Sequence, residues 1–210
     1  MKIGIIGAGN VGGTLGKAWA AKGHDIVFGV RDPRAAKVQD AIKATGGKAR
    51  AASVKEATAQ AEVVVLATPW GATQDAIKGA GNLGGKIVID ATNPLKPDLS
   101  GLSLGHTTSA GEEVARWATG AKVVKAFNTI GAQHMANPRF GAQSASMFIC
   151  GDDAAAKKTV ATLAEALGFE PVDAGPLTQA RLLEPLAMLW ISMAYAYGHG
   201  VDIAFKLLHR

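Results

Sequence analysis

The N-terminal segment of the sequence carries glycines in the spacing G-x-G-x-x-G, which is typical of a loop that holds phosphate groups. The motif comprises Gly7, Ala8, Gly9, Asn10, Val11 and Gly12. Gly7 permits a tight turn, Gly9 lets the backbone approach a pyrophosphate, and Gly12 allows a helix to pack closely. A helix that begins within the motif offers unpaired backbone N–H groups to an anion. The spacing therefore predicts a dinucleotide site, and the alternative is a glycine-rich turn that binds nothing.

An arginine follows the next predicted strand, at the position that commonly distinguishes NAD from NADP, about 20 residues past the motif. An acidic residue there would bind the ribose 2′-hydroxyl, whereas Arg31 can face a 2′-phosphate through a charge-assisted bond of ~1.5–3 kcal/mol. The neighbouring Asp32 is the argument for NAD. Arg34 and Lys37 are either further phosphate contacts or part of a solvated helix face. The segment favours NADP.

Small polar residues follow three later predicted strands, at the edge of the sheet where a ligand is expected. They are Thr68, which is followed by Pro69 and Trp70, then Thr92 and Asn93, then Asn128 and Thr129. Trp70 either offers a flat face to a ring or packs under a loop. The polar side chains either orient a nicotinamide or an acceptor by hydrogen bonds, or only cap turns.

The predicted cleft has no obvious Lys, His or Tyr that could serve as a general acid or base, so we predict no catalytic residue. The histidines have no metal-ligand spacing with one another or with Cys150, so we predict no metal site. Cys150 ends an apolar run, which predicts a small buried hydrophobe. A reaction that moves only a hydride between two cofactors needs positioning and little else.

Apolar runs rich in β-branched residues alternate with helical stretches along the chain. Strands are predicted over Lys2–Ile6, Asp25–Gly29, Ala49–Ala51, Val63–Ala67, Lys86–Asp90, Lys122–Phe127, Ser146–Cys150 and Glu170–Val172. Helices are predicted over Val11–Lys22, Pro33–Thr45, Ser53–Ala61, Ser109–Thr119 and Asp153–Leu167, and Gly175–Arg210 is predicted to be mostly helical. This alternation predicts an α/β fold: a Rossmann-type, doubly wound, mainly parallel sheet with a small C-terminal helical lobe.

The softest division of the chain falls after Asn128, where a loop rich in Gly, Ala and Asn begins. We therefore expect a dinucleotide-binding domain over residues 1–128 and a smaller lobe over residues 129–210, which forms the acceptor cleft and the dimer contacts, with no flexible linker. The predicted helix from Leu182 to Tyr197 is apolar around most of its circumference. It predicts a homodimer, and the alternative is a helix buried within one subunit.

The bulk composition excludes several classes of protein. The 210 residues are 48% apolar and 19% charged, as in soluble globular domains. The net charge of +5 comes from scattered Lys and Arg, which favours anionic small molecules over nucleic acid. The N-terminal apolar run stops at Gly7 and the stretch from Pro185 to His199 is too short to span a bilayer, so we expect no membrane segment. A single cysteine is compatible with a cytoplasmic location.

The sequence resembles the family of coenzyme F420-dependent NADP oxidoreductases and the related cytoplasmic oxidoreductase domain of STEAP metalloreductases. The resemblance spans nearly the whole chain. It rests on Gly7–Gly12, Val30–Arg31, Thr68–Trp70, Val124–Thr129 and Cys150–Asp153, and most distinctively on Asp173–Leu177 with Ala180–Glu184.

The resemblance implies which residues approach the cofactor. They are Ala8, Gly9, Asn10, Val11, Val30, Arg31, Trp70 and Gln74, with Ala132 and Ile203 near the nicotinamide. Archaeal members of the family carry Ser at the position of Val30 and His at the position of Asn128, so this chain departs at one 2′-phosphate contact and beside the acceptor. Arg181 and Glu184, one helical turn apart, are expected to form a structural pair.

The resemblance and the missing acid or base together predict an NADPH-dependent oxidoreductase that passes hydride to a deazaflavin (F420) or a flavin-type acceptor. Two alternatives stay open. One is a reductase of a small imine or carbonyl, and the other is a sensor or subunit that binds NADP(H) without catalysis.

Overall fold

The computed structural model describes residues 1–210 and begins with alternating strands and helices. The first part of the chain comprises β1 (Lys2–Ile6), α1 (Asn10–Ala21), β2 (Asp25–Gly29), α2 (Ala36–Ala44), β3 (Ala49–Ala52), α3 (Val54–Ala59), β4 (Val63–Leu66), α4 (Trp70–Gly79), β5 (Ile87–Asp90), α5 (Ala110–Trp117) and β6 (Lys122–Lys125). The second part comprises η1 (Ala132–His134), β7 (Arg139–Phe140), β8 (Gln143–Ser144), β9 (Ser146–Gly151), α6 (Ala154–Glu165), β10 (Glu170–Gly175), η2 (Leu177–Gln179), α7 (Ala180–Ile191) and η3 (Ser192–Ala196).

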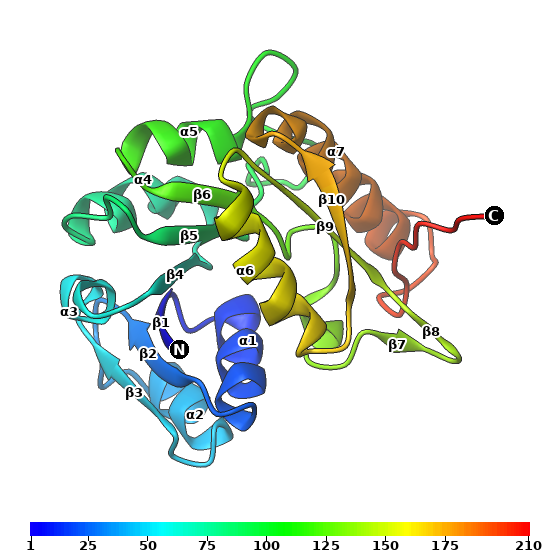
Figure 1. Ribbon diagram of the computed structural model, residues 1–210. Coiled ribbons are helices and arrows are strands. Elements are labelled where there is room, and N and C mark those ends of the chain that lie inside the picture. The colour runs from blue at the N-terminus through cyan, green and yellow to red at the C-terminus, as the bar shows by residue number, and fades with distance from the viewer.

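One eight-stranded sheet runs through the molecule in the order β10-β9-β6-β5-β4-β1-β2-β3 (Figure 1). Strands β1 to β6 are parallel to one another. Strand β9 pairs antiparallel to β6, and β10 runs parallel to β9. The order 3-2-1-4-5-6 for β1 to β6 is that of a Rossmann fold, and it confirms the predicted doubly wound, mainly parallel sheet.

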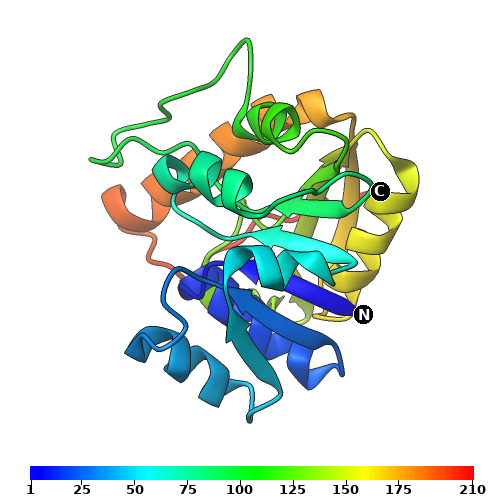
Figure 2. The ribbon, with the colours of Figure 1, turned by 90° about the vertical axis from the view of Figure 1, so that its left-hand side faces the viewer.

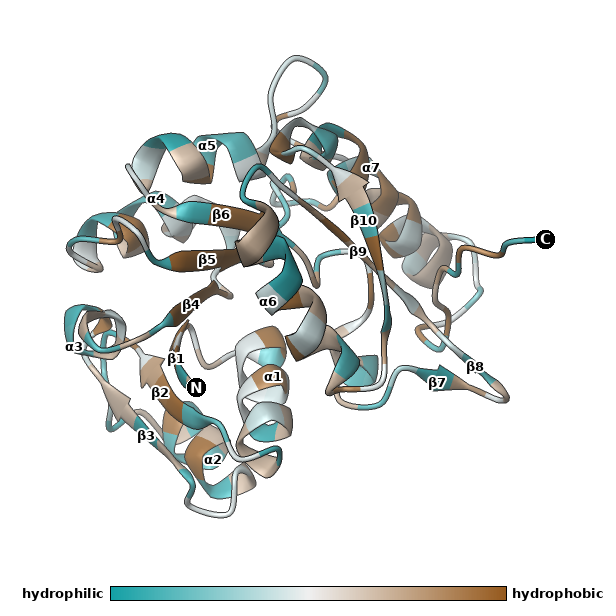
Figure 3. Ribbon diagram, viewed as in Figure 1, coloured by the Kyte–Doolittle hydropathy of each residue, from teal (hydrophilic) through white to brown (hydrophobic).

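The apolar strands explain why helices cover both faces of the sheet. Strands β4 and β5 are among the most hydrophobic segments, and polar residues lie on the outer sides of the helices (Figure 3). Helices α1, α2 and α6 pack on the face that carries Ile3, Ile5 and Val65. Helices α4, α5 and α7 pack on the opposite face, against Leu66 and Val88. A β-branched run buried on both faces therefore forms the centre of the core.

The predicted helix starts at Ser53 and Ser109 are confirmed, and a side chain caps each helix. Ser53 accepts a hydrogen bond from the N–H of Glu56, whose carboxylate accepts from the N–H of Ser53, so a capping box marks this helix start. The Ser109 side chain accepts from the N–H of Glu112 in the same way. Between β5 and α5, residues 91–109 form a long loop that projects from the body of the molecule (Figure 2).

Three predictions of secondary structure were wrong or incomplete. The segment Gly175–Arg210 is helical over Leu177–Ala196, as predicted for most of it, but the helix ends at Ala196 and residues 197–210 have no regular structure. Gly198 and Gly200 both adopt positive φ there, which stops a helix. Helix α4 was not predicted, because Gly71 and Gly79 weaken its helical pattern. The β7–β8 hairpin was also missed. No helix is long and apolar enough to cross a membrane.

Candidate functional site

The glycine motif forms the turn between β1 and α1, where the sequence placed it. Gly7 adopts φ 106° and its N–H donates to the carbonyl of Gly29 at 3.1 Å, which ties the turn to β2. Helix α1 begins at Asn10 with Gly9 as N-cap, and no side chain caps it. Its first turn contains no acidic residue. The N–H groups of the first turn are therefore left for an anion rather than for a side chain of the protein.

The three glycines of the motif differ in the space around them. A methyl group on Gly12 would overlap the carbonyl oxygen of Gly7, and one on Gly7 would lie 2.5 Å from the carbonyl oxygen of Ala67. At Gly9 the nearest atom is the Nζ of Lys37, at 3.9 Å. Packing thus explains Gly7 and Gly12, whereas Gly9 faces open space. This is the arrangement that a pyrophosphate needs for close approach, so the loop fits a dinucleotide.

Basic side chains surround the turn after β2. Val30 donates its N–H to the carbonyl of Ala52, and Arg31, which follows it, is exposed and forms no ion pair. The Oδ1 of Asp32 accepts the N–H of Arg34 at 2.9 Å. This Asx-type contact orients the exposed carboxylate of Asp32 within the turn. The rim that remains beside the loop is positive.

Trp70 is the first residue of α4, and its ring stacks on Trp117 of α5 with centroids 5.2 Å apart and planes at 26°. One face of the indole is therefore a packing surface. Thr68 and Thr73 share a hydrogen bond of 2.9 Å that closes the turn, while Pro69 caps the helix. Gln74 is exposed in the next part of α4. The structure brings these residues to the edge of the sheet that holds the glycine turn, because β1 and β4 are parallel neighbours.

The asparagines at the ends of β5 and β6 bond to each other. The Nδ2 of Asn93 donates to the carbonyl of Asn128, and the Nδ2 of Asn128 donates to the Oδ1 of Asn93 and to the carbonyl of Leu183. The Oδ1 of Asn128 has no partner although it is buried. Phe127, just before it, adopts φ 63°, which is rare for a bulky residue and costs about 1–3 kcal/mol. This strained turn directs Asn128 back towards Asn93 and α7.

A fully buried charge cluster lies beneath these asparagines. The Nζ of Lys125 donates to Asp90 at 2.8 Å, to Glu184 at 2.8 Å and to the carbonyl of Thr92 at 2.6 Å. The three side chains are 0%, 0% and 1% exposed. Sequence reasoning missed the cluster. Two charged residues that end neighbouring apolar strands, Asp90 and Lys125, were the available signal.

Every polar atom of the cluster has a partner. Asp90 also accepts the N–H and the hydroxyl of Thr92. The carboxylate of Glu184 accepts the N–H groups of Ala110 and Gly111 at the start of α5, where the helix dipole favours a negative charge. Burial alone would lower the pKa of Lys125, but Asp90 and Glu184 outweigh it and raise that pKa above its ordinary value. Lys125 is therefore a structural cation.

Cys150 lies close to this cluster and is fully buried, which confirms that it is a small buried hydrophobe. Burial raises the pKa of its thiol to about 12. The thiol therefore stays protonated at neutral pH and is no nucleophile.

The predicted pair between Arg181 and Glu184 was wrong. Arg181 instead makes a bidentate contact with Glu112 of α5, from Nε at 2.9 Å and from Nη2 at 2.6 Å. Glu184 instead reaches into the buried cluster. Because each side chain found a partner on α5 or β6, both residues fix α7 to the Rossmann sheet instead of bonding to each other.

The contacts of Glu112 make the free energy of unfolding depend on pH in the acid range. Hydrogen bonds from Arg181 and then Ser109 lower the pKa of Glu112 below its ordinary value of 4.5. A carboxyl group with a lowered folded-state pKa contributes stability above its unfolded-state pKa and loses it as the pH falls through the folded-state pKa. We expect Glu112→Gln to be less stable than the wild type at neutral pH, and the difference to shrink below pH 4.5. Denaturant titrations across this range measure it, with exposed Glu165→Gln as control; a difference that does not change with pH would contradict the assignment.

The two residues expected near the nicotinamide lie in segments that the structure brings together. Gln133, next to Ala132, donates from its Nε2 to the carbonyl of Val201 at 2.9 Å. His134 contacts Asp202 at 2.9 Å. The indole N–H of Trp190 donates to the carbonyl of Ile203 at 2.8 Å. The C-terminal segment is therefore held against η1 and against α7.

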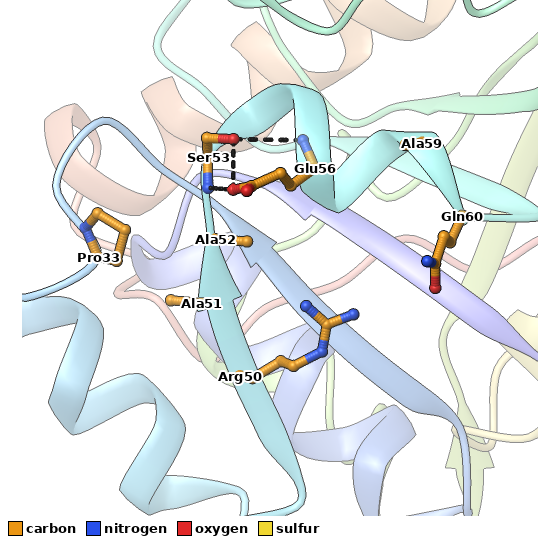
Figure 4. A pocket seen from close by; sticks show the side chains of 8 residues that line it. All are labelled: Pro33, Arg50, Ala51, Ala52, Ser53, Glu56, Ala59 and Gln60. Carbon is orange, nitrogen blue, oxygen red and sulfur yellow. Dashed lines mark hydrogen bonds between the residues drawn. The ribbon is translucent and has the colours of Figure 1, made fainter.

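A hollow of about 560 Å³ lies elsewhere, along edge strand β3. It is lined by Pro33, Arg50, Ala51, Ala52, Ser53, Glu56, Ala59 and Gln60 (Figure 4). The capping box of Ser53 and Glu56 closes one part of it, and Arg50 and Gln60 lie further along (Figure 4). None of the predicted cofactor residues lines this hollow, but Pro33 and Ala52 place one end of it beside the turn that carries Val30 and Arg31.

The sheet order, the open Gly9 and the positive rim define a dinucleotide-binding protein of the Rossmann class. The model of the family described as NADP oxidoreductase, coenzyme F420-dependent, matches residues 2–94. A crystal structure from Arthrobacter sp. FB24, described provisionally as an F420-dependent NADP-reductase, is 36% identical, with a TM-score of 0.91 and full coverage of both chains. A hypothetical protein from Sinorhizobium meliloti is 32% identical, with a TM-score of 0.79, and is covered to 96%.

The chain belongs to this family of NADP-dependent oxidoreductases, as the sequence predicted. It is also 34% identical over 195 residues to the metalloreductase STEAP3 of Rattus norvegicus. The matched stretch covers 90% of this chain and 37% of STEAP3. The chain thus spans little more than a third of that curated relative. A reductive aminase from Aspergillus terreus in complex with NADPH has a TM-score of 0.70 at 18% identity, which shows a shared fold alone.

Proposed function

We propose that this protein is an NADPH-dependent oxidoreductase that passes hydride to a deazaflavin (F420) or flavin-type acceptor. The observation that carries the proposal is the glycine turn, in which Gly9 is open to a pyrophosphate while Arg31 lies exposed on the adjoining rim. The residues that would hold the cofactor are those of the loop together with Val30, Arg31, Arg34 and the start of α4. Bound NADPH supplies a hydride from its nicotinamide ring.

The chemistry of the cleft supports an acceptor that needs no acid or base from the protein. Lys125 is the nearest buried amine, but its three N–H donors already meet Asp90, Glu184 and the Thr92 carbonyl. It therefore has no proton to offer a substrate. Asn93 and Asn128 hold each other and can orient a ligand without exchanging protons. Reduction of a carbonyl or imine would need an acid, whereas hydride transfer between two ring systems needs alignment.

The direct test is NADPH oxidation with a panel of F420, FMN, FAD, ferric chelates and a pyrroline-type imine. We expect turnover with F420 or a flavin. Turnover with the imine alone would select the imine reductase instead. Tight NADPH binding without turnover of any acceptor would make the protein a nucleotide sensor or subunit. An absence of NADPH binding would reject all three functions.

Arg31 is expected to decide between the two nicotinamide cofactors. Arg31→Ala should weaken NADPH binding by ~1.5–3 kcal/mol, roughly ten- to a hundredfold, because the guanidinium loses the 2′-phosphate. NADH binding should barely change, since its 2′-hydroxyl carries no charge. Titration of both nucleotides into both proteins measures the effect. Equal losses for NADH and NADPH would mean that Arg31 only packs against the adenine.

A homodimer through α7 and η3 also stays a proposal. Leu182, Leu189, Tyr195 and Tyr197 are 64%, 51%, 68% and 75% exposed, whereas the inner side of α7 is buried. An exposed apolar face of this kind commonly forms a contact between subunits. Light scattering at micromolar concentration decides, and a monomeric mass would reject it.

A further inference from the structure

Helices α1 and α2 start at the same edge of the sheet and pack side by side. A Cβ on Gly13 of α1 would lie 3.9 Å from the Cβ of Ala41 of α2. Val38, three residues before Ala41 in α2, is buried in the core between the helices and the sheet. The position of α2 along α1 is therefore fixed by apolar packing and not by a surface side chain.

This packing places a lysine beside the glycine turn. Lys37 precedes Ala41 by one helical turn, and Gly9 precedes Gly13 by the same step, so the two pairs face each other along the helices. The Nζ of Lys37 lies 3.9 Å from the Cβ position of Gly9. Lys37 is exposed, and no carboxylate of the chain forms an ion pair with it. An unpaired ammonium thus stands over the one open position of the loop.

We infer that Lys37 binds the pyrophosphate of the dinucleotide, while Arg31 serves the 2′-phosphate. The inference rests on the nucleotide binding proposed above. Gly9 is the N-cap of α1 and has no side chain above it, so the pyrophosphate approaches there. An ammonium at that distance reaches a phosphate oxygen with a small change of side-chain torsions. The pyrophosphate is common to NADPH and NADH, so Lys37 contributes to the binding of both cofactors and selects neither.

The test measures dissociation constants of NADPH, NADH, ADP and adenosine 2′-monophosphate for the wild type, Lys37→Ala and Arg31→Ala. ADP carries two linked phosphates without a 2′-phosphate, and adenosine 2′-monophosphate carries the reverse. Lys37→Ala should weaken NADPH, NADH and ADP by a similar factor, roughly tenfold, and leave adenosine 2′-monophosphate unchanged. Arg31→Ala should weaken NADPH and adenosine 2′-monophosphate and leave NADH and ADP unchanged. Lys43→Ala, at the far end of α2, is the matched control and should change none of them.

Each other result overturns the inference. A loss confined to NADPH and adenosine 2′-monophosphate would assign Lys37 to the 2′-phosphate, and no loss at all would leave it a solvated surface residue. Both require a wild type that binds nucleotide. A wild type that binds none of the four probes rejects the proposed function itself. A thermal melt of Lys37→Ala like that of the wild type excludes an effect on folding.

Discussion

Lys125→Met should destabilise the protein by about 3–5 kcal/mol, which is a large part of the stability of a domain of this size. The substitution removes the only cation from a site where Asp90 and Glu184 are almost completely buried. Two carboxylates would then face each other without a positive partner, and the N–H groups of α5 compensate only Glu184. Denaturant titration followed by tryptophan fluorescence measures the loss as a lower midpoint.

Lys122→Met is the matched control on the same strand. Lys122 pairs with Asp153 at 3.0 Å, but its side chain is 43% exposed. A pair at the surface is worth about 0–1 kcal/mol. If Lys125→Met and Lys122→Met both lower the free energy of unfolding by less than about 1 kcal/mol, the buried cluster does not stabilise the fold as its geometry indicates.

Gly12→Ala and Gly9→Ala should fail in different ways. The new methyl group of Gly12→Ala meets the Gly7 carbonyl oxygen and lies 3.1 Å from Cγ2 of Ile5, so α1 must move away from β1. We expect a loss of about 1–3 kcal/mol or more in stability, together with loss of nucleotide binding. The methyl group of Gly9→Ala meets no backbone, so stability should stay within about 1 kcal/mol of the wild type. NADPH binding should nevertheless weaken roughly tenfold or more, by at least ~1.4 kcal/mol.

Thermal denaturation and NADPH titration of both variants separate these effects. Gly79→Ala at the far end of α4, where a Cβ meets nothing within 4 Å, is the control for a harmless methyl group. Normal nucleotide binding by Gly9→Ala would show that no pyrophosphate passes over the loop.

Local sequence signals predicted the features that depend on short stretches of chain. The buried strands Val63–Leu66 and Ile87–Asp90 followed from runs of β-branched residues, because a strand covered on both faces has no polar alternation. The glycine turn followed from spacing, because Gly7 and Gly12 answer steric needs of the loop itself and Gly9 leaves the space above the loop open. Helix α4 escaped because its burial of Thr73 and Ile77, and not its helix propensity, holds it in place.

The contacts of α7 could not be predicted because they depend on which elements meet in space. Arg181 and Glu184 lie one turn apart, a spacing that favours a pair on an isolated helix. In the folded chain, Glu112 offers Arg181 a bidentate contact and Lys125 offers Glu184 a buried charge, and both are stronger than an exposed pair within one helix. The direction of β9 is a similar case, because the pattern of an apolar strand is the same in either orientation.

The attachment of α7 through Glu184 affects how the protein opens under native conditions. Release of this helix alone would take one carboxylate from Lys125 and leave the N–H groups of Ala110 and Gly111 without an acceptor. Local opening of α7 should therefore require nearly the free energy of global unfolding, and its amide protons should exchange with solvent on that slow scale. Residues 197–210 have no regular structure, and their amides should exchange through small openings. The cooperative folding unit thus extends from β1 to about Ala196, well beyond the Rossmann half of the sheet.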